Sequence, residues 1–76
     1  MSIEKKFLQI KDSIEVEHMK AILLLSDLDE QMLRLSPGQL VGKKGIEFAA
    51  MMDALLQTEQ SLRRVLERME NVGKAG

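Results

Sequence analysis

Hydrophobic residues in the first half of the chain recur with the alternating three-and-four spacing of an amphipathic helix. The most regular series has members one heptad apart: Phe7, Ile14, Ala21, Leu28 and Leu35. The other core position of the repeat is apolar except at two points and holds, in chain order, Ile3, Ile10, Glu17, Leu24 and Gln31. The pattern predicts a helix over about residues 3–35, with Ser2 as its N-cap.

The second half of the chain has the same heptad spacing. Its regular series is Phe48, Leu55, Leu62 and Met69. The accompanying core position holds Met51, Thr58, Val65 and Val72, of which only the threonine is polar. We expect a second helix over about residues 46–71, ended by Asn71 and Gly73, followed by a frayed tail over residues 72–76.

Residues 36–45, "SPGQLVGKKG", separate the two arms and contain the only proline and three of the five glycines. Ser36, Pro37 and Gln39 have the order of an N-cap, a first helical residue and the second member of a capping box. A long helix starting here would enclose Gly42 and Gly45, at about 1 kcal/mol each relative to alanine. We therefore expect a short helical turn, a loose joint and then the main helix; a main helix starting at Pro37 is the alternative.

A second boundary question concerns the first arm. Ser26 followed by Asp29 resembles a capping box, so the helix could break there. The apolar stripe continues beyond this point without a change of phase, which favours an unbroken helix. Two heptad arms joined by a short breaker predict an all-α fold, a single antiparallel two-helix hairpin of the coiled-coil type spanning residues 1–76.

The arms carry more apolar surface than one hairpin can bury between two helices. A helix that is apolar around most of its circumference is usually buried around most of it. We expect a second copy or a partner's helix to complete a four-helix bundle. The residues assigned to this partner-binding surface are Leu23, Leu25, Met32, Met52, Leu56 and Leu66.

Polar residues at core heptad positions often fix the register and the choice of partner. Glu17 interrupts the seam of the first arm, and antiparallel pairing would bring it level with either the Arg63–Arg64 pair or Thr58, depending on the length of the turn. The residues assigned to register and specificity are Glu17, Gln31, Thr58, Arg63 and Arg64.

His18 is the only histidine and lies at the edge of the expected seam, where a packing role is favoured over catalysis. Glu15 lies one turn before it, a spacing used in di-iron bundles, and Glu59 would join them only in a suitable hairpin register. The chain has no cysteine, so disulfides and thiolate metal sites are excluded. We expect no enzyme activity, no metal and no cofactor.

Composition and charge narrow the class of protein further. Seventy-six residues form a thin core that usually needs a partner for stability. Eleven basic and twelve acidic residues give no basic stripe for nucleic acid. No apolar run approaches the roughly 20 residues of a membrane span. The N-terminus has no secretory signal. These features favour a cytoplasmic protein that binds other proteins.

The segments "AILLLSDLDEQMLRL" and "FAAMMDALLQTEQSLRRVLERM", on either side of the breaker, resemble the small helical-hairpin co-chaperones of bacterial type III secretion. Those co-chaperones help to hold the needle subunit soluble before export, and needle subunits are themselves short helical hairpins. The resemblance implies a cytoplasmic chaperone that binds a helical partner. The alternative is a small regulator or phage-type adaptor that binds a larger machine, including one associated with nucleic acid.

Overall fold

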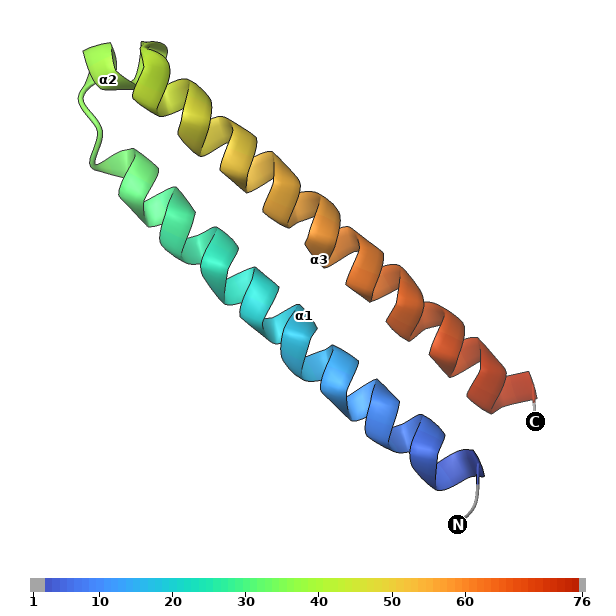
Figure 1. Cartoon of the computed structure of the whole chain (residues 1–76). Coiled ribbons are helices and arrows are strands. Elements are labelled where there is room, and N and C mark those ends of the chain that lie inside the picture. The colour runs from blue at the N-terminus through green and yellow to red at the C-terminus, as the bar shows by residue number, and fades with distance from the viewer. Residues whose placement is uncertain (1–2, 76) are drawn as a thin grey trace.

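In the computed structural model, two long helices lie side by side in opposite directions and are connected at one end by a short third helix (Figure 1). Their bounds are Ile3–Leu33 for α1, Pro37–Val41 for α2 and Lys43–Ala75 for α3. The structure describes the backbone of residues 3–75 and the side chains of residues 4–74; Ser2, the expected N-cap, lies outside them. The predicted all-α antiparallel hairpin is confirmed for the described residues.

The hairpin is long and thin, with extents of 57 × 17 × 14 Å. Its radius of gyration is 17.3 Å, whereas a compact domain of this length would have one of about 11 Å. Two helices packed in a single pair have one shared seam and no second layer. Most side chains therefore remain in contact with solvent.

The capping box at the start of α2 forms as the sequence predicts. The Gln39 amide N–H donates to the Ser36 hydroxyl oxygen at 3.3 Å, and the Ser36 amide N–H donates to the Gln39 side-chain oxygen at 3.0 Å. Pro37 occupies the first helical position, where it has no hydrogen bond to lose. α2 ends after one turn at Gly42, which has an extended backbone.

The glycines after α2 form a tight corner rather than a loose joint. α3 begins at Lys43, three residues before the expected start, so Gly45 lies in its first turn. Gly45 is buried, and a Cβ on it would overlap the backbone carbonyl of Leu40 in α2. A side chain at this position is therefore incompatible with the observed packing of α2 on α3.

The ends of the long helices differ from the expected ones. α1 runs without a break through Ser26 and ends at Leu33, two residues early. α3 continues to Ala75, so the predicted stop at Asn71 and Gly73 is wrong for the described residues. Gly73 keeps a negative φ and remains helical. Lys74 in the last turn suits the negative end of the helix dipole.

The predicted seam is correct in one of its two series on each helix. The regular series, from Phe7 to Leu28 in α1 and from Phe48 to Met69 in α3, is half-buried or buried throughout. The second series is displaced by one residue from the expected positions. In α1 it is Lys11, His18, Leu25 and Met32, and in α3 it is Gly45, Met52, Glu59 and Leu66.

Candidate protein-binding surface

A polar contact joins the two helices near the middle of the hairpin. His18 Nε2 lies 2.7 Å from a carboxylate oxygen of Glu59, and the two side chains are only 19% and 11% exposed. Arg63, one turn further along α3, places its Nε 3.4 Å from the same carboxylate oxygen, and its side chain is 53% exposed. The Glu59 carboxylate thus has one partner inside the seam and one at its edge.

This contact identifies the register of the hairpin. Each of its residues occupies the second seam series of its helix, and the two lie close enough along the hairpin for their side chains to meet. The expected contact between His18 and Glu59 depends on the hairpin register, and the observed register brings the two side chains together. A buried polar pair of this kind is tolerated because each group satisfies the other. No group of three or more acidic or histidine side chains among the described residues could hold a metal ion.

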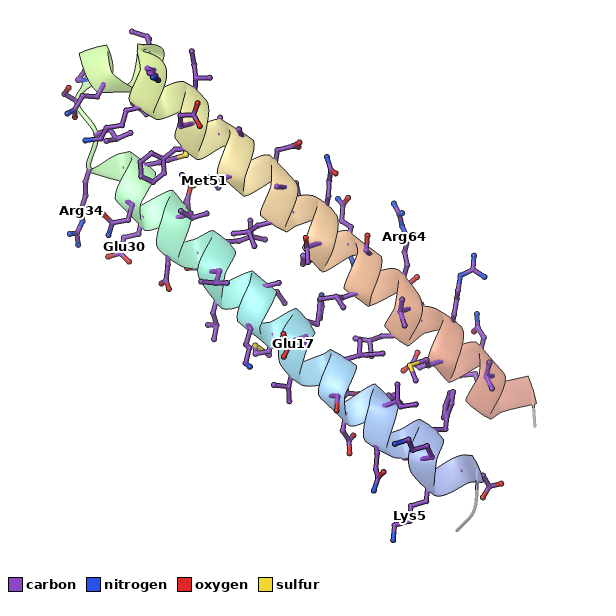
Figure 2. All side chains as sticks on the ribbon, viewed as in Figure 1. Lys5, Glu17, Glu30, Arg34, Met51 and Arg64 are labelled. Carbon is purple, nitrogen blue, oxygen red and sulfur yellow. The ribbon has the colours of Figure 1, made fainter. Side chains whose placement is uncertain are left out.

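The assignment of Glu17 to the core seam is wrong. Its side chain is 62% exposed and pairs with Lys20 on the same helix, at 3.4 Å. Arg63 pairs with Glu59 instead, and Figure 2 shows Arg64 projecting from the side of α3 that faces away from α1. The physical reason is the displaced seam: His18, the next residue after Glu17, turns toward α3.

Gln31 and Thr58 are exposed for the same reason. The Thr58 hydroxyl donates to the backbone carbonyl of Ala54 at 3.0 Å, one turn earlier in α3. The register pair that sequence reasoning missed is His18 with Glu59. The sequence signal for this pair is heptad spacing: His18 lies one heptad before Leu25, and Glu59 lies one heptad from both Met52 and Leu66.

The six residues assigned to partner binding divide into two groups. Leu25, Met32, Met52 and Leu66 are half-buried in the second seam series, so they lie in the seam and not off it as expected, and their assignment to partner binding stays a prediction. Leu23 and Leu56 are exposed, by 56% and 43%, and remain available.

Exposed apolar side chains are the main feature of the surface. Ala21 is the only buried hydrophobic residue among those whose side chains are described. Fifteen large apolar side chains in the same part of the chain are each at least 41% exposed. Soluble monomers seldom expose so much contiguous apolar surface unless it serves for binding.

One side of the hairpin gathers these side chains from both long helices. In an antiparallel heptad pair, the positions just before the second seam series lie on the same side of both helices. We call this side the front face. Its apolar members are Ile10, Leu24, Met51, Val65 and Val72. Its charged members are Glu17 near the middle and Lys44 at the hinge end.

The opposite side, the back face, consists of the positions just after the regular seam series. Its exposed large apolar members are Leu8, Ile22 and Leu56. They alternate with the charged residues Glu15, Asp29, Arg63 and Glu70. The back face is therefore more charged than the front face, and three of its four charges are negative.

A cleft of about 640 Å³ lies at the open end of the hairpin, between the first turns of α1 and the last turns of α3. Phe7, Leu8, Met69 and Val72 supply its apolar wall, and charged side chains, among them Lys11 and Glu70, surround them. The cleft continues the exposed apolar surface of the two helices toward the termini.

Comparison of the chain with protein-family models, with curated proteins and with solved structures found no match. Among the described residues, no helix has the length and apolar character needed to cross a membrane.

Proposed function

We propose that this chain is a non-enzymatic protein-interaction module that buries an amphipathic helix, from a partner protein or from a second copy of itself. The observation that carries the proposal is the disproportion between core and surface. Among the described side chains, one hydrophobic residue is buried, whereas fifteen large apolar side chains are substantially exposed. Water contact with that much apolar surface is unfavourable, and a binding partner removes it.

The mechanism is the addition of helices to the hairpin. A helix laid along the 57 Å hairpin contacts both α1 and α3 at once, and a second hairpin completes a four-helix bundle. Full burial of one large aliphatic side chain contributes about 1.5–3 kcal/mol. For front-face side chains that are already about half covered, the remaining gain is about 1 kcal/mol each.

The biological role that fits this mechanism is a bacterial cytoplasmic chaperone. A co-chaperone of type III secretion is one instance, because such a protein must cover the apolar helix of another subunit and later release it. Half-exposed apolar side chains suit this task, since each contributes a modest amount and the complex remains reversible. Met19 and Met51 on the surface can adapt to partners of different shape.

The experiment is affinity capture from cells that express the chain, using a tagged copy. The control is a copy in which Leu23, Leu24 and Leu56 are replaced by glutamate, which removes exposed apolar side chains and leaves the seam intact. The expected result is one protein, or an untagged copy, retained in stoichiometric amount by the starting chain and lost with the control. Equal retention by both copies, or a starting chain that stays monomeric and retains nothing, would overturn the proposal.

A further inference from the structure

The surface of the hairpin is larger than a chain of this mass keeps as a monomer. Its accessible surface is 6023 Å². A folded monomer of 8.6 kDa has about 4,700 Å² by the usual scaling, an excess of about 1,300 Å² per chain. If two chains each covered that excess, they would bury about 2,600 Å² together, which lies in the range of obligate homodimers. A single partner helix is half of a second hairpin and would cover less.

Charge decides which face a second copy can occupy. A face that packs against its own copy brings identical charges near each other, which is unfavourable. The back face carries three acidic residues, Glu15, Asp29 and Glu70, and one basic residue, Arg63. The front face has Glu17 as its one charge between the hinge end and the termini, and that carboxylate is paired with Lys20 of its own helix. The front face is therefore the self-compatible one.

The front face combines residues of both long helices along the hairpin. On α1, Glu17 lies two turns from Ile10 and two turns from Leu24. On α3, the front-face residues beyond the hinge end are all uncharged: Met51, Thr58, Val65 and Val72. Phe7 and Lys11 line the terminal cleft with Met69 and Gly73, a register that places Leu24 near the level of Thr58.

We infer that the front faces of two copies pack on each other with their hinge ends together, forming a four-helix bundle; this inference rests on the proposed function. In this arrangement α1 of each copy faces α3 of the other. The front face of each α1 then packs on the uncharged front-face residues of the second copy's α3, with Leu24 near its Thr58. The inverted arrangement would instead pack α1 on α1 and bring both Glu17 carboxylates into one interface.

The first test is sedimentation equilibrium of the full chain and two matched variants. Leu24→Glu with Val65→Glu alters the front face, at side chains that are 50% and 41% exposed. Val16→Glu with Ile46→Glu makes the same chemical change outside both faces, at side chains that are 53% and 64% exposed. We expect a dimer for the starting chain and the control. The front-face variant should be a helical monomer, with its dissociation constant raised at least about a hundredfold.

Circular dichroism confirms that each variant is still a helical hairpin. A monomeric starting chain overturns the inference, as does a control variant that dissociates while the front-face variant remains a dimer. Either result leaves the proposed function standing if affinity capture still retains a different protein. Retention of nothing at all would instead refute the proposed function.

The second test concerns the orientation and uses the absence of cysteine from the chain. Leu24→Cys and Thr58→Cys chains are prepared separately, mixed and treated with a short thiol-reactive cross-linker. We expect covalent dimers from the mixture and far fewer from either chain alone. Cross-linking of Thr58→Cys chains to each other, with no covalent dimer of the two different chains in the mixture, would show the inverted arrangement and overturn the orientation.

Discussion

The buried pair between His18 and Glu59 gives the sharpest prediction about stability. We consider His18→Leu, Glu59→Leu and the double variant, because leucine fits the seam positions and shares the shape of its heptad neighbours. His18→Leu removes the inner partner of a carboxylate that is only 11% exposed. Removing one partner of a buried carboxylate in this way costs about 3–5 kcal/mol.

Two effects reduce that cost. Arg63 still lies 3.4 Å from the carboxylate, although its exposure limits its contribution. The new leucine buries apolar surface worth about 2 kcal/mol. The expected net loss for His18→Leu is therefore about 1–3 kcal/mol.

Glu59→Leu should behave differently. It leaves an imidazole without its partner, and an unsatisfied buried polar group of this kind costs about 1–3 kcal/mol. The added leucine contributes about 2 kcal/mol in return, so the net change is near zero. In the double variant no polar group remains unpaired, and replacing a buried pair by apolar side chains stabilises by about 1–4 kcal/mol.

The assay is urea unfolding followed by far-ultraviolet circular dichroism at a fixed chain concentration, because association adds to the apparent free energy of unfolding. The quantity of interest is the coupling between the two sites in the double-mutant cycle. If both single substitutions cost the same amount and their effects simply add, the two side chains do not interact and the register inferred from their contact is wrong.

Three further predictions concern the corner, the capping box and the surface. Gly45→Ala should destabilise the chain by about 1–3 kcal/mol through overlap with α2, whereas Gly42→Ala should cost less; equal melting temperatures for the two variants would contradict the close packing. Ser36→Ala should cost about 0.5–2 kcal/mol in urea unfolding, and no loss would show that the capping box does not stabilise α2. Glu17→Ala should change the free energy of unfolding of the hairpin by only about 0–1 kcal/mol, measured with the monomeric front-face variant as the background; a larger loss would return Glu17 to the seam.

The sequence predicts the hairpin because heptad periodicity survives in both arms and the breaker between them is unambiguous. Phe7 and Phe48 begin regular series whose members are buried or half-buried in the structure. The second series was harder to identify because apolar residues occupy adjacent positions. Leu24 precedes Leu25 and Met51 precedes Met52, so apolar character alone does not say which of each pair turns inward.

The polar residues resolve this ambiguity, but only when both helices are considered together. If the second seam series runs through Leu24 and Met51, it includes Glu17 and Thr58. If it runs through Leu25 and Met52, one residue later, it includes His18 and Glu59. The observed series is the second one, and it places the His18 imidazole 2.7 Å from the Glu59 carboxylate, so each polar group has a partner. The close approach of Gly45 to Leu40 could not be predicted either, because it depends on how α2 folds back onto α3.

The position of the corner at one end of a long, thin hairpin has a consequence for folding. Contacts near Gly45 close short loops, while contacts between Phe7 and Met69 close nearly the whole chain, and the entropy of closure grows with loop length. The two helices therefore pair progressively from the corner, and they separate first at the end where the termini lie. Amide exchange should become slower from the open end of the hairpin toward its middle, because local opening near the termini requires only the outermost contacts to break.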